Sequence, residues 1–354
     1  MAEIKRIYVR GTNWIGDAVM QIPALRELRR IFPAAHITLH TRSWAQGIFE
    51  DAEFIDEILT FEKSKSKIKD VLSQAKILRK KEFDLAVLLP NSFESALAAR
   101  LGGIKKRFGY ATDGRKLLLT DAVKIPEWKS TRHEVYFYLN LIAEIERKLL
   151  GTDTVSASEP KVDLRVSADR RRRAQEILRK NGVDLSRKTV ALGVGSTNSR
   201  AKRWQAGSYA KLNDRLQTEL NANVVLVGAA DESNVSNEVY EKSTKKPIIL
   251  TGKTNLAEAV MILSEIDLLV SNDMGLAHVA SAVGTATLVI FGPTNPNTTR
   301  PWNTDMIYKN VECSPCMLRD CPIDHRCMTR IAAAEVFAQA KEKLFTELKI
   351  DEVR

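Results

Sequence analysis

Short runs of apolar residues alternate along the chain with longer segments in which apolar residues recur every three or four positions. Runs of about four to eight apolar residues are typical of buried parallel strands, and the periodic segments between them are typical of helices packed on a sheet. This pattern predicts an α/β fold with mostly parallel sheets. The predicted strands lie at residues 4–9, 36–40, 54–61, 84–90, 105–110, 189–194, 224–228, 247–250, 266–270 and 286–291.

The alternation is interrupted at residues 151–160, where small and polar residues predict an exposed linker. A chain of 354 residues is also too long for one ordinary hydrophobic core. We therefore predict two domains, one over residues 1–160 and one over residues 161–330. In doubly wound domains of this kind, ligands lie at the carboxyl ends of the strands.

The composition, 44% hydrophobic and 28% charged, is typical of a soluble globular protein. No apolar run is long enough to span a bilayer and no signal-peptide segment is present, so we expect a cytoplasmic protein. The net charge of +10 favours acidic partners, namely nucleic acid, an anionic lipid surface or a phosphorylated ligand. Nucleic acid is not the expected partner, because no binding motif is found and only 6% of residues are aromatic. The basic run at residues 63–81 is expected to be a solvated helix face.

Residues 271–280 carry the strongest chemical signal in the second domain. They follow a predicted buried strand and open a helix whose first turns contain Asp273, Gly275 and His278. Asn272 or Asp273 is expected to cap this helix, and Gly275 allows close approach of a ligand. The N–H groups and positive dipole of a helix N-terminus suit a phosphate or pyrophosphate. The alternative is an ordinary capped core helix with a packed histidine.

Two further loops are expected at the same edge of the sheet. Residues 195–204 combine hydroxyls, small residues and three cations, which suits an anion, although a mobile polar loop is the alternative. Residues 228–232 end in two acids, Asp231 and Glu232, where a ribose hydroxyl partner tends to lie. The convergence of three such loops favours a nucleotide-phosphate site over an ordinary helix cap.

The loop at residues 10–17 follows the first predicted strand of the first domain. Its glycines match neither the dinucleotide fingerprint nor the Walker phosphate loop, so ordinary dinucleotide or ATP binding is not indicated. Asp17 stands at the start of the next helix. It is either a first-turn acid, worth up to about 1 kcal/mol, or a general base.

Five motifs of the chain carry a family resemblance, and they lie at residues 11–17, 90–93, 202–204 and 271–278 and in the cysteine segment 313–327. On these motifs the sequence resembles the ADP-heptose:lipopolysaccharide heptosyltransferases over essentially its whole length. The type II enzymes are the most similar, and type I is the nearest alternative. Family members often carry Ser or Thr where this chain has Met274, which removes a hydroxyl contact.

The resemblance implies a GT-B fold of two Rossmann-like domains, with the last helix, in residues 331–354, crossing back onto the first. It implies an inverting transfer of heptose from ADP-heptose to a lipid A–core glycolipid, without a required cofactor or metal. The basic excess favours peripheral contact with the inner leaflet of the inner membrane. The resemblance implies that Asp17 is the catalytic base, that Arg10, Asn13 and Trp14 lie at the acceptor, and that the donor lies at Ser196, Thr197, Lys202, Glu232 or Asp231, Asp273, Met274, Gly275 and His278.

All four cysteines lie in one short segment with His325 among them, in the pattern C-x2-C-x4-C-x5-C. Four soft ligands at this spacing predict a structural zinc site, and reduced, packed thiols are the alternative. Disulfides are not expected in a cytoplasmic enzyme. The four residues are Cys313, Cys316, Cys321 and Cys327.

Two other classes of function are compatible with the same pattern. One is a sugar-nucleotide epimerase or hydrolase with a pocket closed to large acceptors. The other is a non-catalytic protein that binds a nucleotide or nucleic acid through its basic surface. Binding to DNA that weakens with salt, without sugar-nucleotide turnover, would favour the second of these.

Overall fold

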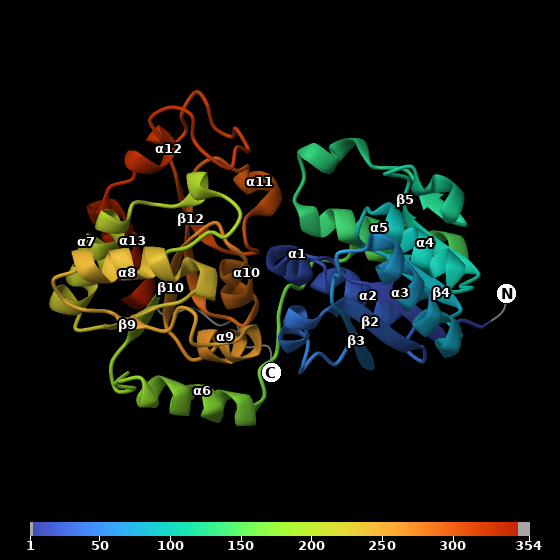
Figure 1. The fold of residues 1–354 in the computed structure, drawn as a ribbon, viewed down its shortest axis with the longest axis horizontal. Helices are drawn as coiled ribbons and strands as arrows, with labels where there is room; N and C mark the ends of the chain where they lie inside the picture. Colours follow the sequence, from blue (N-terminus) through green and yellow to red (C-terminus); the bar gives the residue numbers. More distant parts are fainter. Residues whose placement is uncertain (1–2, 346–354) are drawn as a thin grey trace. The chain divides into compact units, whose positions relative to one another are not determined.

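The computed structural model describes residues 3–345, which form two compact units divided between Val162 and Asp163. The prediction placed this division between residues 160 and 161. Each unit contains one six-stranded sheet whose strands are all parallel, with helices on both faces (Figure 1). The predicted α/β class is therefore confirmed. Within residues 3–345, no helix is both long and apolar enough to cross a membrane.

The strands of unit 1 follow the order β3-β2-β1-β4-β5-β6. Because β1 is central and pairs with β2 and β4, Arg10 lies beside His40 and Leu88 at the carboxyl edge of the sheet. The edge strand β6 was not predicted, because three half-buried residues give no apolar run. The strands are β1 (Arg6–Arg10), β2 (His36–Arg42), β3 (Glu57–Phe61), β4 (Leu85–Leu88), β5 (Lys106–Tyr110) and β6 (Asp121–Val123).

The helices of unit 1 form two layers, since α2 packs with α5 and α3 packs with α4. The helix expected after β1 is interrupted at Gln21, and Pro23 stands in the first turn of the second piece, where a proline is tolerated. The helices are α1 (Ile15–Met20), α2 (Ile22–Ile31), α3 (Lys67–Lys81), α4 (Phe93–Leu101) and α5 (Glu134–Leu150), with short 3₁₀ turns η1 (Ser43–Ile48), η2 (Arg115–Leu118), η3 (Glu127–Ser130) and η4 (Val155–Ala157).

The strands of unit 2 follow the order β12-β11-β10-β7-β8-β9. Strands β10, β7 and β8 are therefore neighbours, and the three loops that follow them meet at one edge. The edge strand β12 was not predicted, because polar residues interrupt its pattern. The strands are β7 (Thr189–Gly193), β8 (Asn223–Leu226), β9 (Ile248–Ile249), β10 (Leu268–Asn272), β11 (Ala286–Phe291) and β12 (Asp305–Tyr308).

The helices of unit 2 also form two layers, with α7 against α8 and α13, and α9 against α6 and α10. The helices are α6 (Ala168–Lys180), α7 (Ala206–Glu219), α8 (Ser233–Lys242), α9 (Leu256–Leu263), α10 (Gly275–Ala282), α11 (Pro296–Thr299), α12 (Arg326–Thr329) and α13 (Ala333–Phe345), with 3₁₀ turns η5 (Arg200–Lys202) and η6 (Ala230–Glu232).

The final described helix, α13, packs within unit 2, and its crossing onto the first domain stays a prediction. Its apolar face, which includes Val336, Phe337 and Leu344, is buried in the core of unit 2 together with Trp204. The guanidinium of Arg215 on α7 also lies 3.8 Å from the centre of the Phe337 ring. An apolar stripe on α13 thus matches apolar surface within its own unit. Residues 346–354 of the expected crossing helix lie outside the described residues.

The segment at residues 151–160 is mostly exposed, as predicted for a linker, but it is anchored to α5. The Glu146 carboxylate accepts hydrogen bonds from the Val155 N–H (2.8 Å) and from the hydroxyls of Thr152 (2.8 Å) and Thr154 (2.6 Å). Burial alone would raise the pKa of Glu146, but these hydrogen bonds outweigh it and lower the pKa to about 2.

We expect Glu146→Gln to lower the free energy of unfolding at neutral pH by about 2 kcal/mol, because hydrogen bonds to a charged acceptor are lost. The folded-state pKa lies below the ordinary value of 4.5, so this stabilisation is complete above pH 4.5 and is lost as the pH falls towards 2. Denaturant unfolding at pH 7 and at pH 3 measures the effect. A variant as stable as the wild type at pH 7 would contradict the anchoring role.

Candidate active site

The three loops that the sequence predicted to converge in unit 2 do so, because they follow adjacent parallel strands. Asn272, the last residue of β10, is fully buried and holds them together. Its side-chain amide donates to the carbonyls of Val194 (2.9 Å) and Gly195 (3.0 Å), and its oxygen accepts from the Trp204 N–H (2.9 Å) and the Tyr209 hydroxyl (3.0 Å). Asn272 is therefore a scaffold for the loop at 195–204.

The expectation that Asn272 or Asp273 caps the next helix is wrong. The N-cap of α10 is Met274, and no side chain caps this helix. Both candidate side chains have other partners, since Asn272 holds the neighbouring loop and Asp273 pairs across the sheet edge. Stronger partners that lie far away in the sequence thus compete successfully with the local capping bond.

Asp273 is buried and is the centre of a charged cluster. Its Oδ2 atom lies 2.6 Å from Nζ of Lys202 and accepts a 2.7 Å hydrogen bond from the Thr294 hydroxyl. Thr294, which follows β11, was not predicted from the sequence. The cluster fixes the half-buried Lys202 ammonium close to the first turn of α10, as an anion site at a helix N-terminus requires.

Glu232 is buried between two glycines, whereas the alternative acid Asp231 is exposed. A Cβ atom on Gly195 would lie 2.1 Å from Cδ of Glu232, and one on Gly228 would lie 2.6 Å from its Oε2. The carboxylate accepts a hydrogen bond from the Ala229 N–H (2.9 Å), and the Thr197 hydroxyl lies 3.5 Å away. Burial raises the pKa of the Glu232 carboxyl above its ordinary value.

The other predicted donor-site residues lie along the same edge. Ser196 is buried, and its carbonyl accepts a 3.0 Å hydrogen bond from Arg203. Gly275 begins α10, and His278 is buried one turn later. Met274 packs against the end of β7, where a Cβ atom on Gly193 would lie 2.8 Å from its sulfur. Unit 2 therefore brings all the predicted donor residues to one sheet edge.

The predicted base Asp17 lies in α1, directly after the loop that follows β1 in unit 1. The hydroxyl of Tyr138 on α5 donates a 3.0 Å hydrogen bond to its Oδ1 atom. Burial is the main cause that raises the pKa of Tyr138 well above its ordinary value, and the nearby Asp17 carboxylate raises it further. The phenol therefore stays protonated and can donate. Tyr138 could not be predicted as a partner of Asp17, because the two residues are 121 positions apart.

Arg10 ends β1 and is buried at the same edge of unit 1. It donates to the carbonyls of Gly11 and His40 and to the side-chain oxygen of Asn13 (3.1 Å), and it stacks over the Phe61 ring at 4.1 Å. No carboxylate pairs with it among the described residues, and burial lowers the pKa of its guanidinium to about 10. An uncompensated buried cation of this kind suits an anionic ligand.

Comparison with known proteins decides the family of this chain. Residues 71–326, more than half of the chain, match the model of glycosyltransferase family 9 (heptosyltransferase). The chain belongs to glycosyltransferase family 9. It is 28% identical over 347 residues to lipooligosaccharide heptosyltransferase 2 of Campylobacter jejuni, covering 96% of this chain and 98% of that protein. It is 28% identical over 307 residues to lipopolysaccharide heptosyltransferase 2 of Escherichia coli, covering 84% and 85%.

The fold agrees with the family assignment. The solved structure of E. coli ADP-heptose lps heptosyltransferase II matches this chain with a TM-score of 0.82 at 25% identity, covering 97% of this chain and 99% of that one. The family 9 assignment makes the chain a glycosyltransferase of the heptosyltransferase class, with the GT-B architecture that the resemblance implied. The epimerase, hydrolase and non-catalytic alternatives are not supported.

The four cysteines of this family 9 enzyme are unpaired thiols in the structure. Cys313 and Cys316 are exposed, Cys321 is half-buried and Cys327 is buried. Burial is the main cause that raises the pKa of the Cys327 thiol to about 11, and the neighbouring thiols raise it further. The donor set suits a soft metal. However, no group of three or more Cys, His, Asp or Glu side chains is gathered at metal-binding geometry within residues 3–345.

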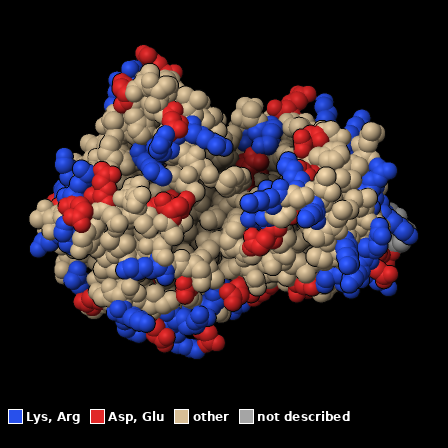
Figure 2. All heavy atoms as spheres, in the orientation of Figure 1, with Lys and Arg blue, Asp and Glu red and all other residues tan. Residues whose placement is uncertain are grey.

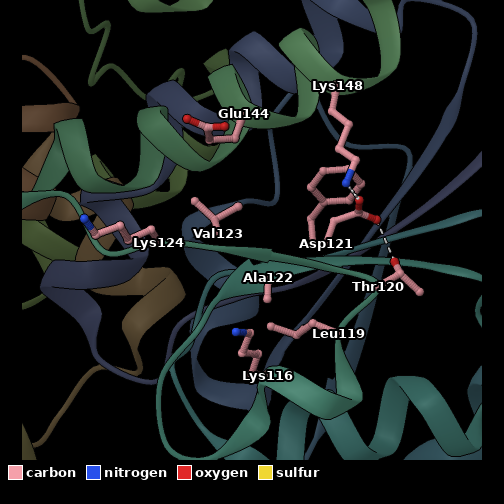
Figure 3. Close-up of a pocket in the computed structure, with 10 residues that line it drawn as sticks. Lys116, Leu119, Thr120, Asp121, Ala122, Val123, Lys124, Glu144 and Lys148 are labelled. Atoms are coloured by element: carbon pink, nitrogen blue, oxygen red, sulfur yellow. Dashed lines mark hydrogen bonds and ion pairs between the residues drawn. The ribbon is translucent and has the colours of Figure 1, made fainter.

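A cavity of about 530 Å³ lies beside the edge strand β6 of unit 1 (Figure 3). Two of its charged side chains already pair with each other, because Asp121 forms an ion pair with Lys148. Asp121 also accepts a 2.7 Å hydrogen bond from the Thr120 hydroxyl. No predicted site residue lines it. We therefore do not assign this cavity to the transferase site of the family 9 enzyme.

Proposed function

We propose that this family 9 enzyme transfers heptose from ADP-heptose to the inner-core heptose of a lipopolysaccharide precursor. The observation that carries the proposal is the donor edge of unit 2, where Lys202, Asp273 and Glu232, three residues that the resemblance implies at the donor, lie on adjoining loops. The names of the curated relatives support the same donor and acceptor class. The alternative within the family is a type I enzyme that acts on the Kdo–lipid A acceptor.

On the donor side, we propose that the pyrophosphate of ADP-heptose binds at the N-terminus of α10. The ammonium of Lys202 would contribute positive charge there, with Ser196 and Thr197 as hydroxyl donors. Glu232, rather than the exposed Asp231, would accept the ribose hydroxyls, because its carboxylate turns inward at the donor edge and fills the space that Gly195 and Gly228 leave. His278 and Met274 would lie near the donor sugar.

The reaction is a single displacement. The acceptor hydroxyl oxygen forms a bond to the anomeric carbon of heptose, the bond between that carbon and the diphosphate oxygen breaks, and the configuration inverts. Asp17 takes the hydroxyl proton, and ADP leaves with the bonding electron pair. Negative charge that grows on the diphosphate is stabilised by Lys202 and the helix N-terminus without a metal ion. Tyr138 holds the Asp17 carboxylate in place through its hydrogen bond.

On the acceptor side, we propose that Arg10, Asn13 and Trp14 bind the core sugar and its anionic groups. Arg10 has no carboxylate partner among the described residues, which leaves its charge available to a carboxylate or phosphate of the acceptor. Trp14 is 58% exposed and offers an apolar face for a sugar ring. Contact with the inner leaflet of the inner membrane would follow from the lipid anchor of the acceptor.

Product analysis tests the proposal directly. Purified protein is incubated with ADP-heptose and a set of truncated core acceptors, and mass spectrometry identifies the product. One added heptose on the acceptor that already carries the first heptose is expected. Transfer to the heptose-free Kdo–lipid A acceptor instead would identify the type I activity, and no transfer to any acceptor would overturn the proposal.

Protonation of Glu232 should weaken ADP binding, because a protonated carboxyl accepts hydroxyl hydrogen bonds less well. Since burial raises the pKa of this group, ADP affinity should begin to fall at a pH above the ordinary carboxyl range. Glu232→Gln should bind ADP about tenfold more weakly, with no such pH dependence. Calorimetry from pH 5 to pH 8 measures both, with Asp231→Asn as the matched control. The same pH dependence in Glu232→Gln would contradict the assignment.

The cysteine spacing leads us to propose a structural zinc ion, although the thiols would have to reorient to bind it. Purified protein is then expected to hold about one equivalent of metal, and a chelator should lower its melting temperature without a direct effect on catalysis. Elemental analysis measures the metal. A content far below one equivalent, with four thiols that titrate freely in denaturant, would contradict this proposal.

A further inference from the structure

Helices α3 and α4 and the turn η2 of unit 1 present an unusual group of exposed apolar side chains. Ile68 is 73% exposed, Leu72 is 56% exposed and Leu117 is 84% exposed, and Phe93 and Leu101 are also exposed. Ile68 and Leu72 lie one turn apart on α3, so they share a face of that helix. We call these five side chains, together with Lys69, Lys76 and Lys80 of α3, the α3–α4 face.

The α3–α4 face is continuous, because an ion pair and two hydrogen bonds join its three elements. Lys67 on α3 pairs with Glu94 on α4 at 2.7 Å, and Arg79 on α3 donates a 2.8 Å hydrogen bond to the Leu101 carbonyl on α4. Arg100 on α4 in turn donates a 2.8 Å hydrogen bond to the Leu117 carbonyl in η2. The exposed apolar side chains therefore lie on one connected surface rather than at scattered positions.

This surface is also strongly basic. Residues 63–81 contain eight Lys and Arg residues and one acid, Asp70. Lys69, Lys76 and Lys80 project from α3 without an ion-pair partner among the described residues. Figure 2 shows Lys and Arg side chains gathered over the part of unit 1 that carries α3 and α4. The sequence predicted only a solvated helix face here, because it could not show that Ile68 and Leu72 lie outside the core.

The α3–α4 face begins at the carboxyl edge of the unit 1 sheet. The chain enters α3 after β3, α4 after β4 and η2 after β5, and all these strands are parallel to β1, whose own loop leads to Asp17. Phe61, on which Arg10 stacks, ends β3 just before the basic run. A surface that binds the α3–α4 face would therefore lie beside the proposed acceptor site.

We infer that the α3–α4 face docks on an anionic phospholipid bilayer. Aliphatic side chains ringed by lysines are typical of a helix that lies in the plane of a membrane, with the apolar groups in the headgroup region and the cations at acidic lipids. The charge complementarity favours a lipid surface over a second copy of this basic chain. The inference rests on the proposed function in one respect, because docking would bring Asp17 to a lipid-anchored acceptor.

Helix α6 of unit 2 provides an internal comparison. It is also rich in arginine and lysine, but none of its side chains is an exposed large apolar residue. A basic helix alone gains only weak, salt-sensitive attraction to a membrane. The α3–α4 face differs from α6 by its apolar side chains, and this difference defines the control.

Vesicle binding of the full chain tests the inference, with vesicles of phosphatidylcholine alone or with added phosphatidylglycerol. Wild-type protein should co-sediment with the phosphatidylglycerol vesicles and much less with phosphatidylcholine alone. The double variant Ile68→Ser, Leu72→Ser should bind at least about tenfold more weakly, since each buried aliphatic side chain contributes to insertion. The triple variant Lys69→Gln, Lys76→Gln, Lys80→Gln should lose the preference for phosphatidylglycerol. The matched variant Arg173→Gln, Arg179→Gln, Lys180→Gln on α6 should bind like the wild type.

Transfer assays separate docking from the proposed function. Both α3 variants should keep wild-type rates on a soluble, deacylated acceptor and lose rate on an acceptor embedded in vesicles. Vesicle binding without transfer by the wild type would leave docking in place and overturn the function. Equal binding of wild type and both α3 variants would overturn docking. A wild-type dimer that Ile68→Ser, Leu72→Ser converts to a monomer, measured by light scattering, would show a second copy on this face and would also overturn it.

Discussion

Asp17→Asn should reduce the rate of heptosyl transfer by about 100- to 10,000-fold, the range typical of a lost general base. The amide keeps the shape of the side chain and can still bind the Tyr138 hydroxyl, but it cannot take a proton from the acceptor. ADP affinity should change little, because Asp17 lies in unit 1 and the proposed nucleotide residues lie in unit 2. Steady-state transfer and ADP calorimetry, measured on the same preparations, give the two values.

Two control variants separate catalysis from local structure. Tyr138→Phe keeps the Asp17 carboxylate and removes the hydrogen bond that orients it, so a smaller loss of about tenfold is expected. Asp169→Asn changes a first-turn acid of α6 that has no proposed role, and it should cost less than about 1 kcal/mol of stability and no activity. Near-normal transfer by Asp17→Asn would remove the catalytic assignment.

The sequence predicted the strands that carry the site because those strands are buried and apolar. β1, β4, β7, β8, β10 and β11 each read as an apolar run, and parallel strands bring their following loops to one edge. The convergence of the loops at 195–204, 228–232 and 271–278 therefore followed from local pattern alone. The edge strands β6 and β12 escaped prediction, because a short, half-buried edge lacks the apolar run on which such a prediction depends.

The pairing of side chains within the site could not be predicted. Asp273 reads locally as a helix cap, yet it pairs with Lys202, 71 positions earlier, and binds Thr294, 21 positions later. Tyr138 reads as one apolar position of an amphipathic helix, yet its hydroxyl binds Asp17. Both contacts depend on which elements pack together, which local periodicity does not determine.

The sequence also could not decide between Asp231 and Glu232. Both acids follow the same strand, and the spacing of the motif allowed either one to meet the ribose. The structure distinguishes them by burial, because Glu232 turns inward over Gly195 and Gly228 while Asp231 stays exposed. Glycines at these two positions are explained by the carboxylate, since a Cβ atom on either would collide with it.

Lys202→Met should slow heptosyl transfer by about 100- to 1,000-fold, the range typical of removing one group that stabilises charge in the transition state. Methionine keeps most of the apolar stem, so packing changes little. The larger part of the loss arises because the diphosphate no longer meets a cation as its negative charge grows. ADP affinity should also fall, by about tenfold, because one charge-assisted contact to the bound diphosphate is lost.

The ion pair between Lys202 and Asp273 allows a second variant to test the same role. In Lys202→Met the buried Asp273 carboxylate loses its paired cation, which costs stability and leaves an acidic group that repels a diphosphate. Adding Asp273→Asn removes that repulsion, so the double variant should recover part of the ADP affinity and of the melting temperature, while transfer stays slow. A double-mutant cycle on ADP affinity, transfer rate and melting temperature measures the coupling. If Lys202→Met binds ADP and transfers heptose like the wild type, Lys202 is only a structural partner of Asp273 and does not bind the diphosphate.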